Sequence, residues 1–302
     1  MNKITVVGSL NMDLVVSAAR LPIGGETIMG SDFQQIPGGK GANQAVAMAR
    51  LGANVQMIGR VGADDFGHVL IENMKQDGVD VSAVKVVEGI STGVALITVQ
   101  PSGENSIIVV AGANGALKPN DLKANEAHLI DAKIVVAQLE VPIETVELAM
   151  KLAKDSGAYT LLNPAPARQL SEALLSHIDL LTPNETELAL LSGLPTNSLE
   201  EVKVAAGVLF EQGVKEMVVT LGSEGALYMN KEGKVHYQNA FKVTPIDTTA
   251  AGDSFTAALA VMLSQGKTIE EALLFATKVG ALTVQKFGAQ SSLPFLYEVE
   301  AF

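Results

Sequence analysis

Cysteine is absent from the 302-residue sequence. This absence excludes a disulfide framework, a thiolate nucleophile and any metal site built on cysteine. Histidine is scarce and scattered, and the four histidines are His68, His128, His177 and His236. A histidine metal cluster is therefore not expected either.

Basic residues are outnumbered by acidic ones, since 21 Lys and Arg against 33 Asp and Glu give a net charge of −12. This acidic balance argues against a nucleic acid or an anionic membrane as the main partner. A small anion remains compatible with it, because a local nest of backbone N–H groups can outweigh the global charge at close range. The expected partners are small molecules.

Long hydrophobic runs are also lacking. No segment approaches the roughly 18 apolar residues of a membrane-spanning helix. The apolar run at residues 4–7 is too short for a signal peptide, and Asn11 and Asp13 follow it at once. We therefore expect a cytoplasmic protein. With 48% hydrophobic residues, no internal repeat and no low-complexity linker, residues 1–302 are expected to form a single domain with a sizeable core.

Short runs rich in Val, Ile and Leu alternate with helix-length amphipathic stretches. The strand candidates are residues 4–7, 55–58, 134–137, 160–162, 180–182 and 217–221, and the helix candidates are 42–51, 143–153, 199–212 and 255–263. Apolar runs without polar alternation are typical of strands covered on both faces. The pattern predicts an α/β fold, in which a mostly parallel sheet is sandwiched by helices and binds its ligand beyond the carboxyl ends of the strands.

Two segments, 14–36 and 93–110, break this rhythm. Each has strand-like character, with turn signals at 22–25 and 101–103 and polar alternation at 93–99. We predict that they form a small β-sheet lid over the ligand cleft. The alternative is two ordinary surface hairpins.

The segment 247–255, with the sequence DTTAAGDSF, carries the strongest functional signal. Its small residues open into an apolar helix, whose first turn has unpaired N–H groups and the positive end of the helix dipole. Ala250, Ala251 and Gly252 leave room for a phosphate to approach. Asp253 beside that phosphate suits a base that accepts the proton of an attacking hydroxyl. The alternative is that these acids only cap the helix.

A second glycine-rich segment precedes the helix at 42–51. Gly38, Gly39 and Gly41 let the backbone come close to a ligand, while Lys40 and Asn43 supply donors suited to hydroxyls. Asn11 and Asp13 follow the first strand, where they could bind the hydroxyls of a sugar. The alternative is a structural glycine-rich turn.

Further polar groups follow later strands. Glu140 follows the strand at 134–137, and the open turn 220–225 follows another strand and suits nucleotide phosphates. Glu187 either organises Mg²⁺ through water or forms a capping box with Asn184, and the spacing alone does not separate these two interpretations. The sequence contains neither a P-loop nor a dinucleotide-binding fingerprint.

These motifs, in this order and spacing, resemble those of the ribokinase-like sugar kinases, from Ile4 to about Pro294. The resemblance implies ATP-dependent phosphorylation of the 5-hydroxyl of D-ribose, with Asp253 as base and the amides of 250–252 stabilising the transferred group. Many members have glycine where this chain has Ala250. Retention of Gly252 and Asp253 favours an enzyme over a non-catalytic sugar-binding regulator. A kinase of deoxyribose, fructose or adenosine is the other alternative, although few aromatic residues are available to stack on a base.

The resemblance also assigns the remaining site residues. The sugar would be held by Asn11, Asp13, Gly39, Lys40, Asn43, Glu140 and Asp253. The nucleotide would face Asn184, Thr220, Gly222, Ser223, Gly225, Gly252 and Thr277, with Glu187 near Mg²⁺. An activating K⁺ would be held by Asp247, Ser292 and the carbonyls of Thr249, Thr283, Lys286 and Gly288. Edge strands of the lid are poorly protected alone, so a homodimer joined through the lid is expected.

Overall fold

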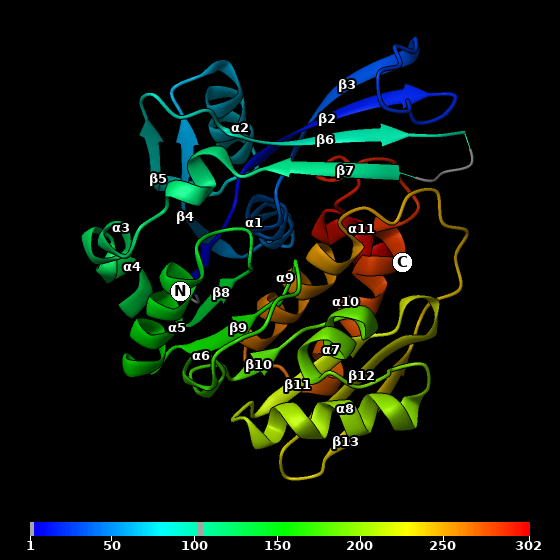
Figure 1. Cartoon of the computed structure of the whole chain (residues 1–302). Coiled ribbons are helices and arrows are strands. Elements are labelled where there is room, and N and C mark those ends of the chain that lie inside the picture. Colours follow the sequence, from blue (N-terminus) through cyan, green and yellow to red (C-terminus); the bar gives the residue numbers. More distant parts are fainter. Residues whose placement is uncertain (1–2, 102–104) are drawn as a thin grey trace.

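The computed structural model describes residues 3–101 and 105–302. Its larger sheet has the strand order β5, β4, β1, β8, β9, β10, β11, β12, β13 (Figure 1). The bounds are β5 Asp80–Val87, β4 Asn54–Gly62, β1 Lys3–Val7, β8 Ile134–Ala137, β9 Tyr159–Leu162, β10 Leu180–Leu181, β11 Glu216–Thr220, β12 Gly225–Asn230 and β13 Val235–Asn239. The strands from β5 to β11 pair in parallel, while β12 and β13 add an antiparallel edge. The predicted mostly parallel sheet is confirmed.

Alternate side chains of the central strands enter two separate apolar cores. Ile4 and Val6 of β1 belong to one core and Val7 to the other. Helices supplying the first core are α1 Lys40–Arg50, α2 Asp65–Gln76, α9 Ala251–Ser264, α10 Ile269–Thr283 and α11 Leu296–Ala301. Helices supplying the second are α3 Pro119–Ala124, α4 Glu126–Ile130, α5 Ile143–Asp155, α6 Glu172–Ser176, α7 Glu185–Ser192 and α8 Leu199–Glu211. Both faces of the sheet are therefore covered, as continuous apolar strands require.

A smaller sheet has the order β3, β2, β6, β7 and stands beside the larger one (Figure 1). Its strands are β2 Asn11–Ala18, β3 Gly30–Gly38, β6 Gly93–Val99 and β7 Asn105–Val110. Two antiparallel hairpins are joined by the parallel pair β2–β6, so the two segments form one sheet rather than two separate hairpins. Ser102 and Gly103 of the predicted second turn lie outside the described residues.

The sequence-based boundaries differ from the structure at three places near the site. Helix α1 begins at Lys40 rather than at Ala42, so Lys40 and Gly41 belong to its first turn. Strand β2 begins at Asn11, three residues before the expected start of the lid segment, because the chain leaves the larger sheet after Val7 and pairs at once with β3 and β6. Helix α9 begins at Ala251 rather than at Phe255. Asp253 therefore lies within the first turn of α9.

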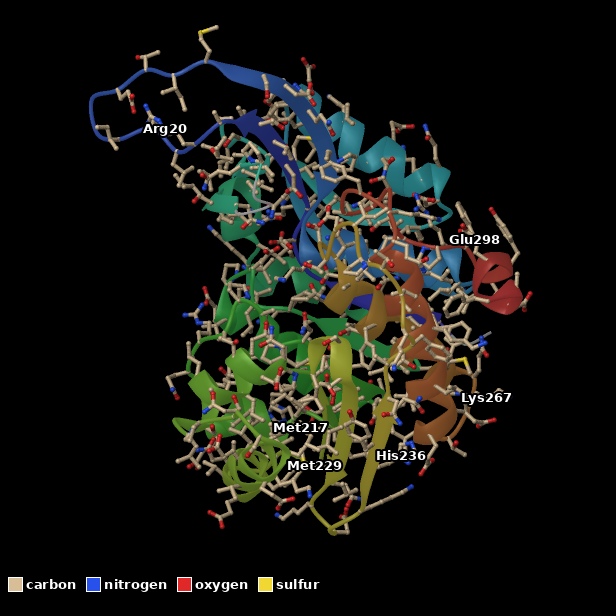
Figure 2. The ribbon with its side chains drawn as sticks, turned by 90° about the vertical axis from the view of Figure 1, so that its right-hand side faces the viewer. Arg20, Met217, Met229, His236, Lys267 and Glu298 are labelled. Carbon is tan, nitrogen blue, oxygen red and sulfur yellow. The ribbon has the colours of Figure 1, made fainter. Side chains whose placement is uncertain are left out.

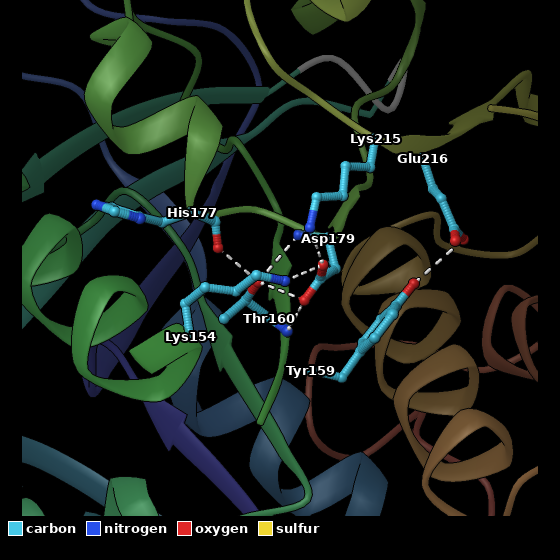
Figure 3. A network of polar contacts seen from close by, with 7 residues as sticks. All are labelled: Lys154, Tyr159, Thr160, His177, Asp179, Lys215 and Glu216. Carbon is cyan, nitrogen blue, oxygen red and sulfur yellow. Dashed lines mark hydrogen bonds and ion pairs between the residues drawn. The ribbon is translucent and has the colours of Figure 1, made fainter. Parts of the chain in front are cut away.

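A polar network joins the amino-terminal ends of three central strands (Figure 3). Asp179, directly before β10, accepts a hydrogen bond from the backbone N–H of Thr160 in β9 at 3.1 Å, and it pairs with Lys154 and Lys215. The hydroxyl of Tyr159 donates to Glu216 of β11 at 3.2 Å. These contacts tie β9, β10 and β11 together at the end opposite their carboxyl ends.

Figure 2 shows the side chains on the ribbon and labels residues of both the interior and the surface. Met217 of β11 and Met229 of β12 are opposite each other in the strand register, and both are buried. Arg20, which follows β2 at the far end of the smaller sheet, is exposed. Within residues 3–101 and 105–302, no helix is both long enough and apolar enough to cross a membrane.

Candidate active site

Two adjoining cavities lie at the carboxyl end of the larger sheet. The larger has a volume of about 710 Å³ and the smaller about 200 Å³. Residues on the walls of both are Asn184, Thr220, Thr248 and Gly252. The larger cavity is lined by every residue that the sequence assigned to the nucleotide, namely Asn184, Thr220, Gly222, Ser223, Gly225, Gly252 and Thr277. The smaller cavity contains both Lys40 and Asp253 in its wall.

Helix α1 holds the carboxylate of Asp253. Asn43 Nδ2 donates to Asp253 Oδ2 at 2.9 Å, and Gln44 Nε2 donates to Asp253 Oδ1 at 3.0 Å. The start of α1 can reach this position because Gly39 has a φ of 89° and packs on the turn after β1. A Cβ at Gly39 would lie 2.6 Å from the backbone nitrogen of Asn11, so only glycine fits there.

The predicted sugar residues gather around this helix start. Glu140 accepts hydrogen bonds from the hydroxyl of Ser9 and, at 3.0 Å, from the backbone N–H of Lys40. Asn11 is buried, and its Oδ1 accepts a hydrogen bond from Asn114 at 2.7 Å. The carboxylate of Asp13 packs against Gly38, where a Cβ would lie 2.4 Å from Oδ2.

Three carboxylates and one lysine interact in this small volume. Burial raises the pKa of Asp13 to about 7, with further contributions from the charges of Glu140 and Asp253. The charge of Asp253 raises the pKa of Lys40, and this effect exceeds the opposing effect of burial. Lys40 is therefore cationic beside the carboxylates, and Asp13 titrates near neutral pH.

The turn before α9 contains the residues that are predicted to form the anion loop. Ala250 has a φ of 60°, in the left-handed region that L-residues rarely adopt, so the loop does take this conformation with a Cβ present. The N–H of Ala251 donates to Thr248 O at 3.2 Å. Gly252 lies on both cavity walls, and a Cβ there would meet nothing within 4 Å. An anion can therefore approach the first turn of α9 from either cavity.

Glu187 forms the capping box that its spacing allowed. Asn184 Oδ1 accepts from the N–H of Glu187, and Glu187 Oε2 accepts from the N–H of Asn184, both at 2.8 Å. Glu187 also lines the smaller cavity, where burial raises its pKa in spite of the Asn184 hydrogen bond and the charge of Lys40. The helix cap and the cavity wall thus share this side chain.

The predicted cation residues adjoin the anion loop. Asp247 Oδ1 accepts from the backbone N–H of Thr249 and Asp247 Oδ2 from that of Gly288, both at 2.9 Å. Thr283 O accepts from the N–H of Lys286 at 3.2 Å, and Ser292 is buried. Across the described ranges, no group of three or more His, Cys, Asp or Glu could hold a metal ion, so a cation here would depend mainly on carbonyl oxygens.

Three buried amides near Asp253 are not among the site residues that the sequence predicts: Gln44 bonds Asp253, and Gln138 and Asn163 bond Gln44. Gln44 lies beside Asn43 on α1, whereas Gln138 and Asn163 directly follow β8 and β9. Gln138 follows the apolar strand β8 and Asn163 follows β9, but an amide after a strand is too common a pattern to predict a role in the site.

Asp13→Asn is expected to stabilise the empty protein. Because the folded pKa of about 7 exceeds the unfolded value near 4, folding stability falls as pH rises between these two values. By this linkage the carboxylate costs about 1 kcal/mol of stability at pH 5 and about 4 kcal/mol at pH 8, so the gain from asparagine should be larger at pH 8 by about 2 to 3 kcal/mol. Urea unfolding at both pH values measures this difference, and an equal gain at pH 5 and pH 8 would contradict the raised pKa of Asp13.

Comparison with known proteins places this geometry in a family. The model of the pfkB family carbohydrate kinases matches residues 1–296. A ribokinase of Schizosaccharomyces pombe is 44% identical over 309 residues, covering 99% of this chain and 97% of that protein. A deoxyribokinase of Salmonella typhi is 38% identical over 300 residues, covering 99% and 98%.

A solved structure has the same arrangement of a larger and a smaller sheet. Arabidopsis thaliana ribokinase, complexed with ribose and ATP, superposes with a TM-score of 0.95 at 37% identity, covering 99% of this chain and 98% of that one. Together with the family match over nearly the whole length, this likeness shows that the chain belongs to the pfkB family of carbohydrate kinases.

Proposed function

We propose that this protein transfers the γ-phosphoryl group of ATP to the 5-hydroxyl of D-ribose, giving ribose 5-phosphate and ADP. The observation that carries the proposal is the position of Asp253, which lies on the wall of the smaller cavity, next to Gly252, a residue shared with the larger one. Relatives named ribokinase, and one such structure complexed with ribose and ATP, supply the identity of the substrates.

In this reaction Asp253 accepts the proton of the attacking hydroxyl. A bond forms between the sugar oxygen and the γ-phosphorus while the bond from that phosphorus to the β,γ-bridging oxygen breaks. Negative charge builds up on the transferred group and on the leaving oxygen, and the first-turn N–H of Gly252 and the cationic Lys40 lie on the cavity wall to stabilise it.

The ribose hydroxyls fit the polar groups that surround the start of α1. Carboxylates such as Asp13 and Glu140 accept hydrogen bonds from hydroxyls, while Asn11, Lys40 and Asn43 carry donors. Gly39 lets the backbone approach the sugar closely. The smaller sheet, which supplies Asn11 and Asp13 from β2, then covers the sugar as a lid.

ATP fits the larger cavity, whose volume of about 710 Å³ is within the range of small-molecule sites. Gly222 and Ser223 of a 3₁₀-turn and Thr277 of α10 line this cavity. Glu187 would hold Mg²⁺ through water, because its carboxylate lines the smaller cavity beside Lys40. Mg²⁺ would neutralise part of the charge of the phosphates.

A cytoplasmic location of the protein stays a prediction.

Asp253→Asn is expected to lower turnover by roughly 10² to 10⁴, with ATP affinity little changed, because the base is lost while the amide keeps the shape of the site. Steady-state ADP release with D-ribose measures the change. Asp155→Asn, at an exposed carboxylate of α5, serves as the control. Full activity of the Asp253 variant would refute the assignment of the base.

A second candidate substrate is 2-deoxyribose, because a relative at 38% identity is named deoxyribokinase. A site built to hydrogen-bond a hydroxyl discriminates against an analogue that lacks it, since buried polar groups are then left unpaired. We expect kcat/KM for ribose to exceed that for 2-deoxyribose by at least tenfold. Equal values for the two sugars would show that the polar groups around α1 do not bind the 2-hydroxyl.

An activating K⁺ is proposed beside the anion loop, held by Asp247, Ser292 and the carbonyls of Thr249, Thr283, Lys286 and Gly288. Asp247 already links Thr249 to Gly288 through hydrogen bonds. A cation bound there would stabilise the strained turn at Ala250 electrostatically. It would thereby keep the N–H of Gly252 directed toward the phosphoryl group.

We expect higher turnover in K⁺ than in Na⁺ at constant ionic strength, and loss of this difference in Asp247→Ala. The measurement is kcat with saturating Mg²⁺, ATP and ribose in each salt. Identical rates of the unmodified protein in both salts would reduce Asp247 to a residue that only links two loops.

A homodimer through the smaller sheet is proposed from the composition of β7. Its consecutive side chains Ile107, Ile108, Val109 and Val110 are exposed by 53%, 65%, 52% and 45%. Side chains alternate between the faces of a strand, so both faces of this edge strand are apolar and uncovered. A second copy of the chain would bury them.

Light scattering at micromolar concentration should give twice the chain mass of 31.5 kDa. Ile108→Asp should shift the mass to that of one chain, because a charge at the interface would lose its water. Ile130→Asp, on α4 and exposed by 49%, is the control. A monomeric mass for the unmodified protein would exclude the dimer.

A further inference from the structure

A chain of neutral amides runs from the larger sheet to Asp253. Gln138, Asn163 and Thr182 each directly follow one of the neighbouring strands β8, β9 and β10, and Gln44 of α1 lies between them and Asp253. Asn163 Nδ2 donates to Thr182 O at 2.9 Å, and Gln44 Nε2 donates to Asn163 Oδ1 at 3.1 Å. Gln138 Nε2 donates to Gln44 Oε1 at 2.6 Å.

The order of these bonds fixes which way each amide faces. The carbonyl of Thr182 can only accept, so Asn163 must present its nitrogen to Thr182 and its oxygen to Gln44. Gln44 then turns its nitrogen toward both Asn163 and Asp253, and its oxygen receives Gln138. An ionised carboxylate is also acceptor-only, so this orientation is the one that Asp253 requires.

Burial confines Gln44 to a positioning role. Gln44 and Gln138 are fully buried, and Asn163 is 6% exposed. With no exposed surface, Gln44 does not touch a substrate in either cavity. Its neighbour Asn43 holds the other oxygen of the same carboxylate, so two consecutive residues of α1 set the plane of Asp253.

We propose that Gln44 is a positioning residue that orients the base Asp253 for proton transfer, and that Gln138 holds the Gln44 amide in the required orientation. The inference rests on the proposed role of Asp253. The Gln44 amide is a neutral donor that fixes the position of the carboxylate by a hydrogen bond, in addition to the attraction between Asp253 and the charge of Lys40.

Gln44→Met tests the first part, because methionine keeps the length of the side chain and removes both donors. We expect kcat to fall about tenfold and KM for ribose to change less than threefold. The acid limb of the kcat–pH profile should move up by about one pH unit, since the charged carboxylate loses a hydrogen bond. The charged groups that interact with Asp253, which are Asp13, Lys40 and Glu187, are unchanged in this variant.

The matched control is Gln56→Met in β4, because Gln56 is also a fully buried glutamine but bonds Ser82 instead. It should lose stability without moving the acid limb. Gln138→Met is the second variant. Gln138 Oε1 is buried with no partner among the described residues, so the hydrogen bond that this variant removes is the one from Gln138 Nε2 to Gln44 Oε1. We expect the same direction of change as in Gln44→Met, with a smaller amplitude.

The outcomes separate this inference from the proposed function. If Gln138→Met and a folded Gln44→Met both keep the unmodified kcat and pH profile while Asp253→Asn is inactive, Asp253 is the base and the positioning role is wrong. If Gln44→Met fails to fold, the acid limb of Gln138→Met decides. If the unmodified protein does not phosphorylate ribose, the proposed function itself fails.

Discussion

Two hydrogen bonds from α1 to the carboxylate of Asp253 join parts of the site that lie 209 and 210 residues apart in the sequence. Two backbone conformations allow this contact. Gly39 lets α1 start against the turn after β1, and Ala250 accepts a left-handed φ so that α9 starts one residue later. The first turns of two helices thereby meet beyond the carboxyl ends of the parallel strands, where α/β sheets bind ligands.

The carboxylates gathered around the start of α1 are electrostatically unfavourable. Burial raises the pKa of Asp13 to about 7, and the nearby charges of Glu140 and Asp253 add to this effect. Lys40 offsets part of this repulsion. A polyol would provide the donors that these carboxylates lack when the site is empty, so binding specificity and native-state strain have the same origin.

The sequence predicted the parallel sheet and the second sheet because each leaves a local signal in apolar runs and turns, and it indicated the open turn 220–225 that lines the larger cavity. It did not separate the two interpretations of Glu187, and the structure shows a capping box on a residue that also lines the smaller cavity. Gln44 and Gln138 were missed, since a neutral amide has no distinctive pattern. Their role depends on strand register and on contacts across 94 and 209 residues, which no local window contains.

The most direct test of the account is the identity of the product. The purified protein, given ATP, Mg²⁺, K⁺ and D-ribose, should form ADP and a sugar phosphate in equal amounts, and ³¹P and ¹³C NMR should place the phosphate on O5 of ribose. ADP release without a sugar phosphate, or a phosphate on any other ribose oxygen, would contradict the claim that the two adjoining cavities bring the γ-phosphoryl group to the 5-hydroxyl at Asp253.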